Sequence, residues 1–231
     1  MSDEATSAEV GHRGHRERLR ERFLTGGPGA LPDYEMLELL LFGAISRADT
    51  KPLAKRLLDR FGSYANVISA APDDLKSVNG VGDSVLATLK IVRDAAIRLA
   101  RHELTQRDVI SSWQQLIDYC RAAMGRENVE QFRIFFLDRK NALIKDEEQQ
   151  RGTVDQTAVY PREVVKRALE LNASAIIMVH NHPSGDTTPS RGDIEMTRLV
   201  KDACEKIGIT LHDHVIISAR GEASFRSLGH L

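Results

Sequence analysis

The densest group of chemically active side chains lies in residues 179–193, which read VHNHPSGDTTPSRGD. His180 and His182 are two residues apart at the predicted end of a buried strand, so their side chains project from the same face. Asp193 falls in the first turn of a helix that Ser190 is predicted to open, across the loop from both histidines. Two imidazoles and one carboxylate leave a fourth tetrahedral position for water, which is typical of catalytic zinc. The spacing therefore predicts a hydrolytic Zn2+ site held by His180, His182 and Asp193.

Each part of this pattern is ordinary by itself. A His-x-His pair alone is more often a solvated strand end, and Ser190-x-x-Asp193 alone would be a common helix cap. The segment His212-Asp213-His214 also combines two histidines with an acid, but we expect a hydrogen-bonded cluster that supports the site rather than a second metal site. The metal hypothesis depends on strand, paired histidines, Gly/Pro loop and helix entry occurring in one connected segment.

The elements that must position these residues alternate after residue 112. Strands are predicted at 132–137, from 142, at 175–179 and at 215–217, and helices at 113–124, from Pro161 and from Ser190. Alternating strands and helices predict a three-layer α/β domain. The unbroken apolar run at 175–179 predicts a strand that is buried on both faces.

The first hundred residues show only helical periodicity and turns. We therefore predict an all-helical domain at 1–105 and an α/β zinc-binding domain at 106–231. Gly80-Val81-Gly82 lies between two predicted helices and resembles the turn of a helix-hairpin-helix motif, in which glycines let backbone amides approach a phosphate. Gly80, Val81 and Gly82 are therefore candidate DNA contacts. A plain glycine turn between packed helices is the alternative, and Asp83 favours it because its charge opposes a phosphate.

Composition and charge exclude several classes of protein. The net charge is −1, and neither domain carries the excess of positive charge that a strong nonspecific nucleic-acid binder shows. The longest apolar run is only strand-sized, so we expect no membrane-spanning segment and no membrane partner. The polar N-terminus has no secretory signal pattern, and Cys120 and Cys204 form no CxxC pair. A reducing, cytoplasmic setting is therefore expected.

The string HNHPSGDTTPSRGD, preceded by Pro161-Arg162-Glu163 and followed by Asp213-His214, resembles the bacterial RadC family, whose C-terminal domain is of the JAMM (MPN+) metalloprotease type. The resemblance covers nearly the whole chain, including the helical front. It implies a JAMM/MPN domain with a mixed sheet, a bound Zn2+ and a historical link to DNA repair, and with the turn at 80–82 we expect the helical front to be a helix-hairpin-helix domain.

The JAMM pattern also implies an acid outside the loop, at the start of the strand that follows the first helix of the domain. The matching position is Glu130, which would act as general base and acid on the attacking water. Ser190 would hydrogen-bond the oxyanion or the water. Glu127, Glu147 and Glu148 are rivals of Glu130, because acids near turns are common.

Hydrolysis of an amide or isopeptide bond in a peptide or protein is the function that these residues favour. In one alternative, the metal site acts on a nucleic-acid phosphodiester while the helical domain holds the strand. In the other, the chain is a DNA- or protein-binding module whose site is not catalytic. A single site without a second metal disfavours phosphodiester cleavage. A zinc deaminase is excluded because the chain has no P-C-x-x-C segment to accompany an H-x-E.

Overall fold

The computed structural model describes residues 3–27, 29–105, 108–151 and 159–231. The chain forms two compact units, Met1–Ala95 and Ala96–Leu231. Their division falls within the long helix α6 (Asp83–Thr105), whereas the boundary expected from the sequence at residue 105 is the last residue of that helix. In the described part of the chain, the first unit contains helices and turns, and the strands all belong to the second unit.

Five helices of the first unit pack around a core of leucine and valine side chains. They are α2 (Asp33–Ala44), α3 (Lys51–Phe61), α4 (Tyr64–Ser69), α5 (Pro72–Lys76) and the start of α6, while α1 (Asp3–Gly26) contacts α2 through ion pairs. Pro52 and Pro72 lie in the first turns of α3 and α5, where a missing amide hydrogen removes no helical hydrogen bond. Leu37, Leu57 and Leu89 are completely buried in this core. The predicted all-helical front is confirmed.

Five strands of the second unit form one mixed sheet. They are β1 (Gln131–Leu137), β2 (Leu143–Arg151), β3 (Ala175–Asn181), β4 (Thr210–Ile217) and β5 (Glu222–Ser224), in the order β2-β1-β3-β4-β5. The pair β3–β4 is parallel and the other neighbours are antiparallel. All seven residues of the central strand β3 are buried, as the apolar run in its sequence predicts.

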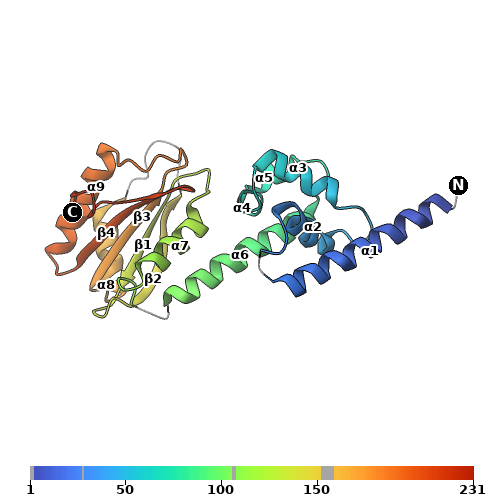
Figure 1. Ribbon diagram of the computed structural model, residues 1–231. Coiled ribbons are helices and arrows are strands. Elements are labelled where there is room, and N and C mark those ends of the chain that lie inside the picture. The colour runs from blue at the N-terminus through green and yellow to red at the C-terminus, as the bar shows by residue number, and fades with distance from the viewer. Residues whose placement is uncertain (1–2, 28, 106–107, 152–158) are drawn as a thin grey trace. The chain divides into compact units, whose positions relative to one another are not determined.

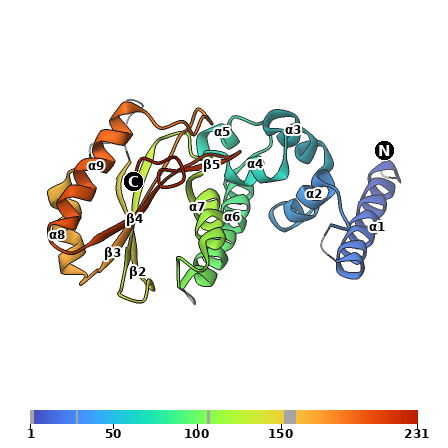
Figure 2. The ribbon, with the colours of Figure 1, turned by 60° about the vertical axis from the view of Figure 1, so that its left-hand side comes forward.

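Helices cover both faces of this sheet. Helix α7 (Trp113–Met124) packs on one face, against Phe135, Ile177 and Val215. Helices α8 (Pro161–Glu170) and α9 (Arg191–Glu205) pack on the other face, which carries Phe136 and Met178 (Figures 1 and 2). The second unit is therefore a three-layer α/β domain, and the predicted fold class is confirmed.

The crossover between the parallel strands determines where the reactive segment lies. Parallel neighbours cannot be joined by a tight turn, so the chain leaves β3, runs back along α9 and enters β4. Consequently the first turn of α9 lies at the end of the sheet where β3 finishes. The loop between Asn181 and Arg191 spans this short gap.

The described helices include none with the length and apolar character needed to cross a membrane.

Because helices cover both faces of the sheet, the side chains in the middle of β3 contribute strongly to the stability of the second unit. We expect Ile177→Ala, at a completely buried position of β3, to lower the free energy of unfolding by about 2–5 kcal/mol. The same change at Ile144 on β2, which is 37% exposed, serves as the matched control and should cost less than about 1 kcal/mol. Urea unfolding of the two variants measures both values, and equal losses would contradict this description of the core.

Candidate metal centre

Three ligand-type side chains converge where β3 ends and α9 begins. His180 is the penultimate residue of β3, His182 follows the strand directly, and Asp193 is the third residue of α9. The two Nε2 atoms are 3.0 Å apart, while Asp193 Oδ1 lies 3.4 Å from His180 Nε2 and Oδ2 lies 3.7 Å from His182 Nε2. One ligand atom from each residue lies within 4.8 Å of the others. The structure thus brings together the three residues that the sequence pattern selected.

The surroundings of the two histidines determine which ring nitrogens carry protons. His182 Nδ1 lies 2.6 Å from the carbonyl oxygen of Asp186, which can only accept, so Nδ1 carries a proton. Burial lowers the pKa of His180 to about 4, so this imidazole is neutral near pH 7. The pKa of His182 is raised, chiefly by the Asp193 carboxylate, whose Oδ2 lies 3.7 Å from Nε2. When both imidazoles are neutral, two nitrogen lone pairs and a carboxylate face one another, and this donor set fits a zinc ion.

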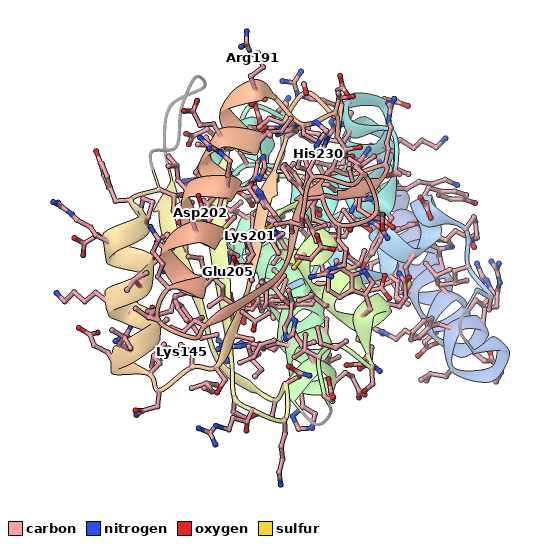
Figure 3. The ribbon with its side chains drawn as sticks, turned by 90° about the vertical axis from the view of Figure 1, so that its left-hand side faces the viewer. Lys145, Arg191, Lys201, Asp202, Glu205 and His230 are labelled. Atoms are coloured by element: carbon pink, nitrogen blue, oxygen red, sulfur yellow. The ribbon has the colours of Figure 1, made fainter. Side chains whose placement is uncertain are left out.

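Asp193 is held in place by the helix that it begins. Ser190 Oγ accepts a hydrogen bond from the Asp193 amide at 3.1 Å, and the Ser190 amide donates to Asp193 Oδ2 at 2.8 Å. This reciprocal capping box leaves Oδ1 directed at His180. Partial burial raises the pKa of Asp193, but the imidazoles of His182 and His180 and the hydrogen bonds with Ser190 outweigh it and hold the pKa well below its ordinary value. The exposed Arg191 marks this end of α9 in Figure 3, where its side chain extends away from the helix.

Glu130 lies beside the cluster and directly precedes the neighbouring strand β1. Phe132 pairs with His180 in the antiparallel register, so continuing that register sets Glu130 opposite His182. Side chains two residues apart on a strand share a face, which directs Glu130 to the side of the histidines. Burial raises the pKa of this half-buried carboxyl, the negative charge of Asp193 raises it further, and His182 lowers it. Glu130 therefore interacts electrostatically with two of the three ligand-type residues.

The rival acids on β2 are engaged elsewhere. Both carboxylate oxygens of Glu147 bind the Arg167 guanidinium, at 2.8 Å and 2.5 Å. Glu148 lies 3.7 Å from the guanidinium of Arg133. Since β1 separates β2 from β3 in the sheet, these two acids lie one strand farther from the histidines than Glu130.

Comparison with known proteins identifies the family. A family model described as "RadC-like JAB domain" matches residues 110–230, and one described as "UPF0758 N-terminal" matches residues 12–87. The chain is 60% identical over 219 residues to a UPF0758 protein of Ruegeria pomeroyi, covering 95% of this chain and 98% of that one. It is 62% identical over 213 residues to a UPF0758 protein of Rhodobacter capsulatus, covering 92% and 100% respectively. The chain belongs to the RadC family.

In this RadC-family chain, a residue between the two histidines, to which the sequence pattern assigned no role, supports the site from the other face of β3. Asn181, between the two histidines, is buried and its side chain points to the opposite face of β3. Its Oδ1 accepts a hydrogen bond from the Gln131 amide at 2.7 Å, and its Nδ2 donates to the carbonyl of Val129 at 3.2 Å and to that of Glu127 at 3.4 Å. Asn181 thus holds the backbone on both sides of Glu130. A polar residue at the end of a fully apolar strand face was the signal available in the sequence.

The segment His212-Asp213-His214 forms no joint metal site. The Asp213 carboxylate accepts hydrogen bonds from the amides of His214 and Arg226 and from the Ser224 hydroxyl, which attach β5 and the following turn to β4. His212 Nε2 lies 2.8 Å from a side-chain oxygen of the β1–β2 turn, whereas His214 contacts His180. Among the described residues, His180, His182 and Asp193 form the single cluster with metal-binding geometry.

The turn at 80–82 connects α5 with α6 in the helical unit. Gly80 has a φ of 97°, which glycine adopts without steric cost. The Val81 amide donates a hydrogen bond within the turn, so it is not available to a phosphate. Lys76 forms an ion pair with Asp83 at 2.9 Å, which offsets one positive charge near the turn. The Arg56 guanidinium also lies against the turn, where its Nε donates to the carbonyl oxygen of Asn79 at 3.2 Å. Contact of Gly80, Val81 and Gly82 with DNA stays a prediction.

The three hydrogen bonds of Asn181 predict a large effect from a small change. Asn181→Asp keeps the acceptor for the Gln131 amide but turns a charged oxygen toward two carbonyl oxygens. We therefore expect the free energy of unfolding at pH 7 to fall by more than about 2 kcal/mol. Asn79→Asp, at an exposed position outside the left-handed region of φ, is the matched control and should change it by less than about 0.5 kcal/mol. Thermal unfolding measures both, and a wild-type value for Asn181→Asp would contradict the role of its amide group.

Proposed function

We propose that this RadC-family chain is a zinc-dependent hydrolase that cleaves amide bonds, including isopeptide bonds, in peptides or proteins. The observation that supports the proposal most directly is the convergence of His180, His182 and Asp193 within 4.8 Å at the end of β3, next to Glu130. A zinc ion bound by such a set lowers the pKa of water and polarises a carbonyl group. His180 is buried while His182 and Asp193 keep some exposure, so the cluster is accessible from the side of His182 and Asp193.

Proton transfer is the role proposed for Glu130. Its carboxylate would take a proton from the attacking water and deliver it to the nitrogen of the leaving amine. The raised pKa makes Glu130 a stronger base than an exposed glutamate, and burial is the main cause. The backbone on each side of Glu130 is held by Asn181, which limits the positions that the carboxylate can reach.

Ser190 is proposed to stabilise negative charge on the carbonyl oxygen of the substrate. Its Oγ accepts a hydrogen bond from the Asp193 amide through a lone pair, so the hydroxyl proton remains for donation. The hydroxyl is exposed at the entrance to α9. A donor fixed before the reaction stabilises an oxyanion without a reorganisation cost.

Cleavage of a nucleic-acid phosphodiester is less well supported. Enzymes of that class often use two metal ions about 4 Å apart. The described residues contain one ligand cluster, and no second cluster adjoins it. DNA binding by the helical unit and a role in DNA repair stay predictions that are independent of the hydrolase proposal.

The first test measures the metal. We expect the wild-type protein to bind one zinc ion per chain and His182→Ala to bind zinc at least about 100-fold more weakly, because a ligand is removed. His230→Ala, at an exposed histidine outside the cluster, should bind as the wild type does. Competition with a chromophoric chelator gives the affinities, and equal zinc binding by His182→Ala and the wild type would disprove the ligand assignment.

The second test separates catalysis from metal binding. Glu130→Gln should keep zinc affinity within a few fold but lose turnover by about 10²–10⁴-fold, since an amide cannot accept the proton. The substrate is a mixed library of linear peptides and peptides joined through a lysine side-chain amide, with cleavage read by mass spectrometry. Glu148→Gln, which changes a rival acid on β2, is the matched control and should cleave like the wild type. Retained turnover in Glu130→Gln would move the role to another acid, and a zinc-loaded wild type that cleaves neither peptide class would refute the proposed activity.

A further inference from the structure

A chain of buried hydrogen bonds runs behind the candidate metal centre and joins two of its ligand residues. His180 Nδ1 lies 2.7 Å from His214 Nε2, His214 Nδ1 lies 2.6 Å from Thr197 Oγ1, and Thr197 Oγ1 lies 2.5 Å from the backbone carbonyl oxygen of Asp193. His214 and Thr197 are 0% and 1% exposed. The chain therefore starts at one ligand residue on β3, passes through β4 and α9, and ends at another.

The direction of every hydrogen bond in this chain follows from its last member. Two oxygen atoms 2.5 Å apart must share a proton, and the Asp193 carbonyl has none, so the Thr197 hydroxyl donates. Thr197 Oγ1 can then only accept from His214, which requires a proton on His214 Nδ1.

The same reasoning gives the direction of the hydrogen bond between His180 and His214. A neutral His214 with its proton on Nδ1 has a lone pair on Nε2. His180 must then donate from Nδ1, which leaves the lone pair of His180 on Nε2, the atom that faces His182 and Asp193.

Packing around the two imidazoles favours one proton on each. Phe132 stacks on His180 with ring centroids 5.9 Å apart, and Phe225 stacks on His214 at 4.4 Å. A charged His214 among these buried aromatic rings would lose its hydration, and neither of its hydrogen-bond partners, His180 and Thr197, carries a carboxylate. His214 therefore carries a single proton, on Nδ1, and its Nε2 lone pair requires the proton of His180 to lie on Nδ1.

We propose that His214 and Thr197 are positioning residues that fix the tautomer of His180, so that Nε2 of His180 is presented as a metal ligand. The proposal deepens the zinc-hydrolase function and rests on it for its purpose. Neither residue supplies a ligand atom: His214 contacts Nδ1 of His180, and Thr197 contacts the backbone carbonyl oxygen of Asp193. If Thr197 donated to His214 instead, both imidazoles would carry their protons on Nε2, and the proton of His180 would occupy the space between the ligand atoms.

The first experiment observes the tautomers in the metal-free wild-type protein. Long-range ¹H–¹⁵N spectra distinguish Nδ1–H from Nε2–H imidazoles. We expect Nδ1–H at both His180 and His214. An Nε2–H tautomer at either residue would overturn the proposal, and this result does not depend on whether the protein binds zinc or hydrolyses anything.

The second experiment removes only the hydroxyl group. Thr197→Val keeps the shape of the side chain and should weaken zinc binding by about 10–100-fold, the usual effect of losing an orienting partner. Thr197→Ser, which keeps the hydroxyl, should bind zinc within about 3-fold of the wild type and keep the Nδ1–H tautomer of His180, whereas Thr197→Val should lose that single tautomer. Chelator competition and the same spectra provide the readouts.

The outcomes separate this proposal from the proposed function. Equal zinc affinity in the wild type and Thr197→Val overturns the positioning role while leaving the ligand assignment intact. Equal weakening by Thr197→Val and Thr197→Ser also overturns it, because packing of the methyl group would then be the cause. Absence of zinc binding in the wild type refutes the zinc hydrolase, and the tautomers of the metal-free protein still decide the hydrogen-bond chain.

Discussion

The parallel pairing of β3 with β4 is the constraint on which the site depends. A crossover is required between two parallel neighbours, and α9 provides it, so the start of α9 must lie at the end of β3. This arrangement brings Asp193 to the two histidines across a short loop. The capping box then fixes the first turn of α9, so the position of the carboxylate follows from helix geometry rather than from a free rotamer. One supersecondary unit therefore supplies the complete ligand set.

Burial of His180 has two opposing consequences for this site. Removing an imidazole from water costs free energy unless both ring nitrogens have partners. Here Nδ1 contacts His214 and Nε2 faces the cluster, so the cost is offset by polar contacts on both sides of the ring. The same burial holds the pKa of His180 at about 4, which keeps protons from competing for this nitrogen near neutral pH. His182, which is more exposed and has a raised pKa, is the ligand-type residue at which a proton competes more strongly.

The fold class and the ligand-type triad could be predicted because each leaves a local signal. Strand, loop and helix entry at 175–193 have distinct compositions, and the three polar residues occupy fixed places within them. The position of Glu130 was different. Its relation to His182 depends on the antiparallel register of β1 with β3, which joins residues about fifty positions apart. Only the family resemblance pointed to Glu130. The hydrogen bonds from Asn181 to the backbone on each side of Glu130 depend on the same register, so the sequence could not show which residues Asn181 binds.

A one-residue irregularity in β4 explains why the sequence, which predicted that the segment 212–214 supports the site, could not show that His214 and not His212 contacts His180. Ile176 pairs with Leu211, but Ile177 pairs with Asp213, so His212 is passed over in the register. Without this shift, His214 would align with Val179 on the α7 face of the sheet. With it, His214 aligns with Met178 on the α9 face, where His180 lies, and Asp213 turns to the opposite face. The segments at 180–182 and 212–214 look alike in the sequence but are arranged differently. His180 and His182 share one face, whereas the irregularity in β4 separates His212 from His214, which contact different partners.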